Sequence, residues 1–497
     1  MENNPRYLFT NKNNTWIINA IVLSIIFTVI CVLVIGTGTT LLWLLPVVLL
    51  MISFGFISID KFLFLTVFLV PASVQLRFLI PDVSADISLP TELMLSGILV
   101  LMIFKIFISR EIDRGILKNT VSIISFLILG WCIITSLTST MPAVSFKSLI
   151  TRLWFFAGFY LLSAEIFRKT SRIKIYFYAY ITGLIPVVIY YLMRMWEAGI
   201  FNQKEAYKAI RPFFNDHTSF GAALAFCIPV IIYFITSRET ARIIRIMLSF
   251  ILFLFSAAFI FSYSRAAWLS LFVAALVVSI LLLRISWKIV FPVVAVILIF
   301  VIMSWSNIIV QLNENKQESS SNIQKHLQSI ANIKSDVSNM ERVNRWRSAL
   351  RMSGEKPLMG WGPSTYQFKY APFQISAEKT IISTNYGEGG NAHSEYLGSL
   401  VDSGIPGMML YILLLFVSIR KGIIIWKTHF DKQIRNLALA LVAGLITYVV
   451  HGTLNNFLDT DKISSLFWGM IAAIVAIDIN LKQEMDPGNL SQVSGND

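Results

Sequence analysis

The chain has 497 residues, of which 56% are hydrophobic and only 14% are charged. A soluble chain of this length needs more charge to cover its surface, so the composition excludes an ordinary soluble globular protein. The net charge of +13 is spread over short clusters between apolar runs, which argues against nucleic acid as a partner and favours membrane lipids.

Apolar runs long enough to cross a bilayer recur along the whole sequence. A hydrocarbon core about 30 Å thick needs roughly 20 apolar residues per helix. The runs lie at 16–35, 39–58, 61–80, 90–109, 119–139, 147–167, 174–196, 217–236, 244–263, 266–284, 287–306, 404–426, 436–455 and 463–480. We therefore predict an all-α polytopic membrane protein with about 12–14 transmembrane helices. The run at 61–80 is the least secure, because it contains Pro71 and ends near Arg77.

Basic residues alternate between successive connections. With the N-terminus in the cytoplasm, every second connection is rich in Lys and Arg, as the positive-inside rule requires. These inner clusters fall within 110–118, 168–174, 238–245, 284–288 and 420–435. The alternation predicts an even number of spans with both ends inside. We expect the polar tail at 483–497 to be disordered and cytoplasmic.

One connection on the outer side is much longer than the others. It covers 307–393 and separates a bundle of about eleven spans at 1–306 from C-terminal transmembrane helices at 394–482. A connection this long is usually functional. Its first part is rich in Ser, Asn, Gln and Lys.

The second half of this loop is patterned. Residues 341–352 predict an amphipathic helix, with Val343, Trp346 and Leu350 on one face. The glycine and proline residues at 354–357 and 360–363 predict two breaks after it.

Arginine residues on the outer side need an explanation, because the positive-inside rule depletes them there. Arg152 and Arg211 are explained equally well by contacts with lipid headgroups. Arg265 lies in a tight turn between two apolar runs without an acidic residue nearby, which favours a functional role. Arg342 lies on the predicted loop helix. Since guanidinium groups clamp phosphate oxygens in a bidentate manner, several at one depth suit a diphosphate on a membrane lipid.

Among the five histidines, His393 is the candidate for proton transfer. It follows a glycine-rich approach at 387–390 and precedes a predicted helix. A neutral imidazole can accept a proton from a hydroxyl group near pH 7. Structural or solvent-exposed roles are expected for the others: a helix-end contact for His217, a core position for His451, and solvent for His326 and His429.

Metal chemistry has little support in the sequence. Asp459 and Asp461 form the one close acidic pair on the outer side; a solvated turn explains them most simply, and a cation site stays an alternative. The three cysteines lie inside apolar runs and are interpreted as small buried hydrophobic residues.

Three stretches resemble the O-antigen ligase family, within a wider group that includes O-antigen polymerases. The first is the Ser-Arg-small-small turn at 262–269. The second is Arg342 with Trp346, followed by the Pro-x-x-Gly-x-Gly pattern at 357–362. The third is the His-Ser-x-Tyr-Leu type segment at 391–397, followed by Gly-Ile-Pro-Gly at 404–407. The resemblance extends over about 211–470.

This resemblance implies a GT-C-like, metal-independent, inverting glycosyltransferase without a cofactor, located in the bacterial inner membrane with its active site facing the periplasm. The donor would be a glycan on undecaprenyl diphosphate, and the acceptor a hydroxyl group of lipid A-core or another glycan. By motif, Arg265 and Arg342 would bind the diphosphate and His393 would activate the acceptor. Arg211 would add to the basic pocket.

Two alternatives are left open. The motifs do not separate a ligase from an O-antigen or exopolysaccharide polymerase, which uses a lipid-linked glycan as acceptor. A polysaccharide transporter or flippase is disfavoured, because transporters usually show repeated halves and interrupted helices around a site at the midplane, whereas here the charged residues collect at the outer rim.

Overall fold

The computed structural model describes residues 58–79, 87–108, 113–286, 340–384 and 390–485, together with isolated positions between 288 and 303. The spans predicted at 16–35 and 39–58, most of the one at 287–306, and the tail beyond 485 lie outside the described residues. The polar stretch at 311–339 does too.

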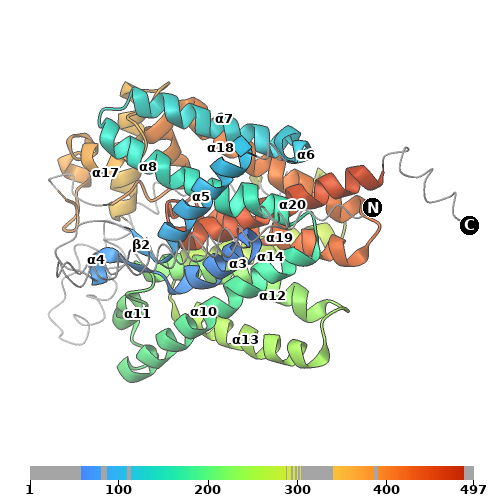
Figure 1. Cartoon of the computed structure of the whole chain (residues 1–497). Coiled ribbons are helices and arrows are strands. Elements are labelled where there is room, and N and C mark those ends of the chain that lie inside the picture. Colours follow the sequence, from blue (N-terminus) through green and yellow to red (C-terminus); the bar gives the residue numbers. More distant parts are fainter. Residues whose placement is uncertain are drawn as a thin grey trace, which may run out of the picture.

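The described chain is almost entirely helical (Figure 1). Its first half contains α3 (Ile59–Leu69), η2 (Val70–Ala72), β1 (Val74–Gln75), α4 (Leu76–Leu79), β2 (Ser88–Leu89), α5 (Thr91–Ile108), α6 (Arg114–Lys118), α7 (Thr120–Leu137), α8 (Pro142–Phe155), the π-helical η3 (Phe156–Leu162), α9 (Ser163–Ile166), α10 (Ser171–Ala198), α11 (Gln203–Ala209) and α12 (His217–Thr236). Its second half contains α13 (Arg242–Phe261), α14 (Arg265–Leu282), a helix at 340–355, α17 (Tyr366–Lys369), η4 (Ala371–Phe373), η5 (Ser376–Glu378), α18 (Glu395–Thr428), α19 (Lys432–His451) and α20 (Asp461–Glu484).

Nine helices in the described part of the chain are long and apolar enough to cross a membrane. They are α7, α8 with its continuation to Ile166, α10, α12, α13, α14, α18, α19 and α20. The prediction of an all-α polytopic membrane protein is therefore confirmed. Most predicted spans coincide with one of these helices to within a few residues, and α18 begins earlier than expected.

The span predicted at 61–80 is wrong. Helix α3 ends at Leu69, and a short 3₁₀ turn with Pro71 at its start follows. Pro71 has no N–H to continue the helical ladder. The chain then forms β1, which pairs antiparallel with β2, so that Gln75 lies opposite Ser88.

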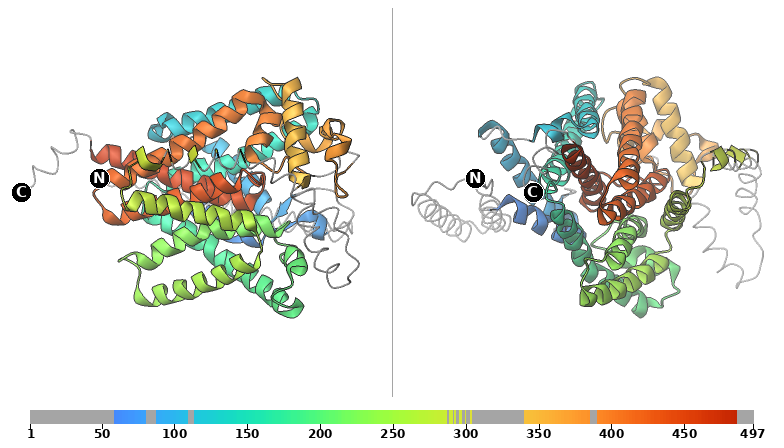
Figure 2. Two further views of the ribbon diagram at one scale, coloured as in Figure 1. Left: turned by 180° about the vertical axis from the view of Figure 1, so that it is seen from behind. Right: turned by 90° about the vertical axis from the view of Figure 1, so that its right-hand side faces the viewer.

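Helix α20 is the centre of the bundle. Its span is 89% buried, whereas that of α13 is only 22% buried. Helices α12, α18, α19 and the α8–α9 segment all pack against α20, and the end-on view in Figure 2 shows it enclosed by other helices. A helix that is apolar on all sides belongs in such a position, and a helix with an exposed apolar face suits contact with lipid.

Helix α18 is interrupted near its start. Gly404 has φ of +67° and Pro406 follows it within the helix. The turn after the 340–355 helix uses this break: Ile405 N–H donates to Pro357 O (2.8 Å), and Trp361 N–H donates to Val401 O (2.8 Å). The second and third sequence motifs are therefore joined by main-chain hydrogen bonds.

The helix at 340–355, here called the loop helix, confirms the predicted element but not its predicted buried face. Leu350 is 54% exposed. The residues that face inward are Glu341, Asn344, Arg345, Ser348, Ala349 and Met352. Polar side chains lie inward because they find partners there, as described below, so apolar periodicity alone selected the wrong side.

Candidate active site

Basic and imidazole side chains meet at one end of the bundle, where α12, α14 and α18 begin and α19 ends. This end, called the His393 end below, also carries α11, α17 and the small sheet (left in Figure 1). Asp216 is the N-cap of α12 and Arg265 is the first residue of α14. Arg342 lies on the loop helix, and His393 lies just before α18. Four segments distant in sequence thus contribute side chains.

Arg265 is presented by a tight turn between α13 and α14. Tyr263 adopts φ of +51°, and the Ser264 side chain caps α14 by accepting from Ala267 N–H (3.4 Å). The Arg265 side chain is exposed. It makes no ion pair or hydrogen bond with any described residue. The guanidinium group is therefore available to an anion, and the N-terminus of α14 also favours negative charge.

Arg342 lies close enough to these groups to interact electrostatically. Burial lowers the pKa of its guanidinium below the ordinary value, and the positive charge of Arg265 lowers it further, while Asp216 opposes the shift. A bound anion would relieve the unfavourable effect of burial and of the neighbouring Arg265 on the charge of Arg342.

Asp216 is the acidic group that interacts with Arg342. Its carboxylate already accepts hydrogen bonds from the first turn of α12. Its Oδ1 accepts from Thr218 N–H (2.8 Å), Thr218 Oγ1 (2.6 Å) and Ser219 N–H (2.8 Å). Burial alone would raise the pKa of Asp216, but these hydrogen bonds outweigh burial and hold the pKa below its ordinary value. Asp216 and Arg265 both act on Arg342, so this group of one carboxylate and two guanidinium groups keeps a net positive charge.

His393 has a main-chain conformation fixed by its neighbours. Its φ is +49°. Its N–H donates to Asn391 Oδ1 (3.0 Å) and its carbonyl accepts from Trp346 Nε1 (3.2 Å). Trp346 lies on the loop helix, so the Arg-x-x-x-Trp motif positions the histidine turn directly.

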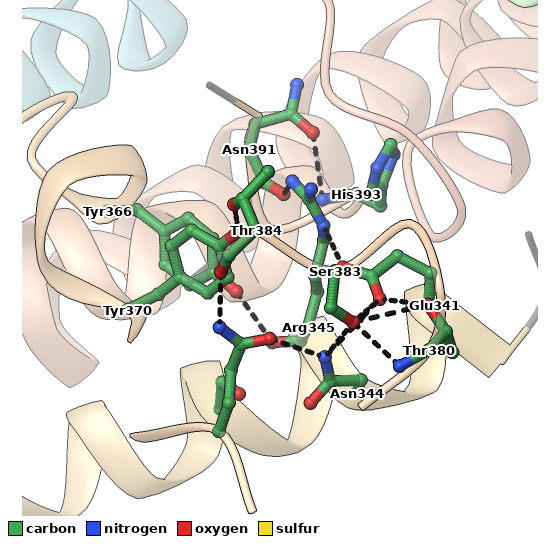
Figure 3. A network of polar contacts seen from close by, with 12 residues as sticks. Glu341, Asn344, Arg345, Tyr366, Tyr370, Thr380, Ser383, Thr384, Asn391 and His393 are labelled. Carbon is green, nitrogen blue, oxygen red and sulfur yellow. Dashed lines mark hydrogen bonds and ion pairs between the residues drawn. The ribbon is translucent and has the colours of Figure 1, made fainter. Parts of the chain in front are cut away.

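The imidazole of His393 is neutral and uncommitted. Burial, followed by the charges of Arg345 and Arg342, lowers the pKa of His393 to about 4. Its ring nitrogens make no hydrogen bond with a described residue, and Figure 3 shows the ring turned away from the Glu341 carboxylate. Such a ring can accept a proton from an incoming hydroxyl group.

Arg345 ties the loop helix to the turn before His393 (Figure 3). Its Nε pairs with Glu341 Oε1 (3.0 Å), its NH1 donates to Asn391 O (3.2 Å), and its guanidinium lies over the Tyr370 ring (5.2 Å). Both charged side chains are buried. Sequence reasoning placed Arg345 only among the basic residues of the loop. The Glu four residues earlier was the available signal.

Glu341 stays ionised despite its burial. Burial raises its pKa, but hydrogen bonds from Ser383, Thr380 and Arg345 outweigh that effect and lower the pKa below its ordinary value. The Thr380 hydroxyl donates to Glu341 Oε2 at 2.8 Å, and Ser383 binds the same oxygen. A charged Glu341 keeps Arg345 in place, so this network supports the site rather than the chemistry.

Gly390 is required at the end of the glycine-rich approach. Its φ is +114°, and a Cβ there would lie 1.9 Å from Arg345 NH1. The backbone must pass this close to the guanidinium for Asn391 to be bound by it.

The structure does not bring Arg211 into the group. Its guanidinium is exposed and donates from Nε to Asn215 O (3.2 Å). No described interaction joins it to Arg265, Arg342 or His393. Arg211 lies on the same connection as Asp216, and its role stays a prediction.

Arg152 has protein partners that the sequence did not reveal. It lies 3.5 Å from carboxylate oxygens of both Asp402 and Asp459. These two ion pairs account for an arginine at this end of the bundle without a lipid headgroup.

The interpretation of Asp461 as part of a solvated turn is wrong. Asp461 is fully buried and accepts hydrogen bonds from Ser73 (2.7 Å) and Thr91 (2.5 Å). The polar neighbours Asp459, Thr460 and Lys462 gave no sign of these partners, which are distant in sequence. The described part of the chain contains no group of three or more His, Cys, Asp or Glu residues that could hold a metal ion.

The other histidines have structural surroundings. His451 is buried, with Nε2 3.1 Å from Asn455 Nδ2. His217 stacks on Tyr207 (4.1 Å between ring centroids). The expectation that His429 is solvated is wrong, since it is buried. The prediction for His326 lies outside the described residues.

The fold and this site together define a class: a polytopic helical membrane protein with a cluster of arginine side chains and a neutral imidazole at one end of its bundle. Residues 249–412 match the family model described as O-Antigen ligase. This segment is therefore similar to the O-antigen ligase family, and the match supports a family assignment on these residues. The match covers about a third of the sequence and includes Arg265, Arg342 and His393, but not Arg211. No curated protein matches the chain.

This assignment supports a transferase role of the O-antigen ligase or polymerase type, with lipid-linked glycans as substrates. It is also consistent with the multi-pass membrane topology of the described helices.

Proposed function

We propose that this protein is an O-antigen ligase, which transfers a glycan from undecaprenyl diphosphate to a hydroxyl group of lipid A-core. The reaction takes place at the periplasmic face of the bacterial inner membrane. The observation that carries the proposal is the meeting of Arg265, Arg342 and His393, from three separate segments, at one end of the bundle.

The arginines serve the leaving group. As the bond between the anomeric carbon and the diphosphate oxygen breaks, negative charge develops on that oxygen. The exposed guanidinium of Arg265 and the half-buried one of Arg342 stabilise this charge in a partly dry site. The positive charge that a metal ion often supplies in such reactions comes here from the protein, so the proposed reaction needs no ion.

His393 serves the acceptor. Its neutral imidazole takes the proton of the attacking hydroxyl group while the hydroxyl oxygen forms the new glycosidic bond. The diphosphate leaves from the opposite side, so the anomeric configuration is inverted. General base catalysis of this kind typically contributes about 10²–10⁴-fold.

The test is transfer by the purified protein in detergent, with a defined glycan diphospholipid donor and lipid A-core as acceptor. Product formation without an ion gradient would support a transferase and exclude a transporter or flippase. If product forms only when the acceptor is a second lipid-linked glycan, the protein is a polymerase and not a ligase.

A gene deletion separates the same two alternatives in cells. Loss of a ligase leaves lipid A-core without O-antigen. Loss of a polymerase leaves single repeats attached to the core.

A further inference from the structure

We propose that a cavity beside the arginine and histidine cluster is a binding subsite for a saccharide unit of one of the two glycan substrates. The cavity has a volume of about 480 Å³, within the range of roughly 300–1,000 Å³ typical of small-molecule sites. It lies between α8, the β1–β2 sheet, the start of α12 and the start of α20. The inference rests on the proposed function, because it names where part of that substrate binds.

The walls of the cavity combine aromatic rings with hydrogen-bonding groups. Phe213, Phe368 and Phe457 supply apolar faces, and Gln367 and Asn215 supply side-chain amides. Sugar rings present C–H groups on one face and hydroxyl groups at the edges, so they match such a mixture. An acyl chain does not, because it would leave the polar groups unpaired.

One wall carries a buried acceptor that no described residue satisfies. The Oε1 atom of Gln75 is buried and makes no hydrogen bond with any residue that the structure describes, although Gln75 lines the cavity from β1. A buried polar atom without a partner costs free energy, and native proteins usually satisfy such atoms. A sugar hydroxyl group would supply the missing donor.

The charged side chains that line the cavity are of both signs: Lys147 and Lys462 are basic, and Glu92, Asp459 and Asp461 are acidic. Lys462 Nζ is bound to Ser73 (2.6 Å) and lies near Asp461 (3.4 Å). Asp459 pairs with Arg152 (3.5 Å). Glu92 is buried and forms no ion pair with a described residue. Sugar hydroxyl groups can donate to the carboxyl groups and accept from the lysines, so a neutral saccharide can use lining groups of either sign.

The cavity lies next to the start of α12, which also carries Asp216 of the proposed diphosphate site. Asn215 and Ser219 line the cavity, and they flank Asp216, whose charge acts on Arg342. Phe457 also lines the cavity, and its ring lies 5.7 Å from that of His451. A glycan whose reacting carbon lies at the arginines can therefore extend past the start of α12 into the cavity.

The test fills the cavity and removes its unpaired acceptor. Val144→Trp adds bulk from the face of α8 that lines the cavity, and Gln75→Met removes the amide at nearly constant length. Ala143→Trp is the matched control, since Ala143 is exposed on the same helix and does not line the cavity. Melting temperature in detergent verifies folding of each variant.

Transfer kinetics are measured with each substrate varied in turn. We expect Val144→Trp and Gln75→Met to raise the KM of one substrate at least tenfold, with the other KM and the Ala143→Trp control unchanged. The affected substrate, donor or acceptor, identifies the source of the saccharide. Folded variants with both KM values within twofold of wild type would overturn the subsite.

A binding measurement keeps this inference separate from the proposed function. The probes are the oligosaccharides released by mild acid from the donor and from the acceptor, observed by saturation-transfer NMR. One of them should bind wild type and His393→Ala equally and bind Val144→Trp at least tenfold more weakly. Binding without any transfer would refute the transferase and retain the saccharide site. Transfer without binding of either probe would do the reverse.

Discussion

At the scale of single residues, the arginines of the His393 end differ in whether a carboxylate of the protein already neutralises their charge. Arg345 is paired with Glu341 in the interior, whereas Arg265 is exposed and unpaired among the described residues. The paired arginine holds the structure, and the unpaired one is left for a ligand. Composition cannot make this distinction, because both residues look alike in the sequence.

Replacing His393 with Ala should abolish proton removal from the acceptor. We expect kcat to fall by about 10²–10⁴-fold, with membrane insertion and melting temperature little changed. His429→Asn is the control, because His429 accepts a hydrogen bond from Asp431 N–H and an Asn side chain can replace that contact. Near-normal transfer by His393→Ala would remove His393 from the mechanism.

Replacing Arg265 with Lys keeps the charge but removes the planar fork. We expect transfer to fall by about tenfold or more, because Lys cannot bind two phosphate oxygens in a bidentate manner. Arg242→Lys, at the first position of α13, should have no effect. Wild-type activity of Arg265→Lys would mean that only charge matters at this position.

The pH dependence of transfer should reflect the low pKa of His393. The imidazole accepts a proton only in its neutral form, which persists in the free enzyme down to about pH 4. The profile of kcat/KM, which reports the free enzyme, should therefore have no acidic limb from His393 near its ordinary value. Bound diphosphate neutralises Arg342, so the limb in kcat should lie at higher pH. An acidic limb in kcat/KM near pH 6.5 would contradict this assignment.

At the scale of elements, the interruption of α18 positions the catalytic turn. The loop-helix turn is bonded to α18 through Pro357 and Trp361, and Trp131 Nε1 donates to Ser403 O (2.7 Å) at the break. The Gly-Ile-Pro-Gly motif is therefore a docking point for another segment of the same chain.

Gly404→Ala should disrupt this docking point. Its φ of +67° is unfavourable for Ala, and a Cβ would lie 2.0 Å from Leu358 O. We expect a loss of about 1–3 kcal/mol from backbone strain alone, seen as a lower melting temperature in detergent and weaker transfer. Gly354→Ala, where a Cβ meets nothing within 4 Å, is the control and should not destabilise. Equal melting temperatures for both variants would contradict the argument.

Hydropathy predicted the long helices well, because a bilayer span needs a continuous apolar run whatever its partners. Hydropathy failed where contacts with other parts of the chain decide the local structure. The α3 region broke at Pro71, and the loop helix turned Glu341 and Arg345 inward. The residues of the site were predicted from motifs, but the network around Arg345 depends on contacts such as that with Asn391, distant in sequence.

At the scale of the whole molecule, the bundle has two chemically different ends. The His393 end carries the loop helix and the cavity. The opposite end contains the basic connections between α12 and α13 and between α18 and α19 (right in Figure 1). This asymmetry is what the positive-inside rule requires if the basic end is cytoplasmic.

Cysteine labelling can test this orientation. Leu358 (64% exposed) and Phe430 (73% exposed) lie at opposite ends, and Cys132 and Cys227 are buried. In a Cys31→Ser background, a membrane-impermeant maleimide should label Leu358→Cys in intact spheroplasts. It should label Phe430→Cys only after permeabilisation. The opposite result would place His393 in the cytoplasm and refute a periplasmic reaction.

The main-chain bonds between the 357–362 turn and the broken start of α18 have a mechanical consequence. Arg342 and His393 are carried by segments that these bonds join, so we expect them to move together. Arg265 lies on a separate element, α14. If the site widens to admit a bulky glycan, we therefore expect Arg265 to move away from the other two residues, and an anion that bridges Arg265 and Arg342 to bring the elements together again.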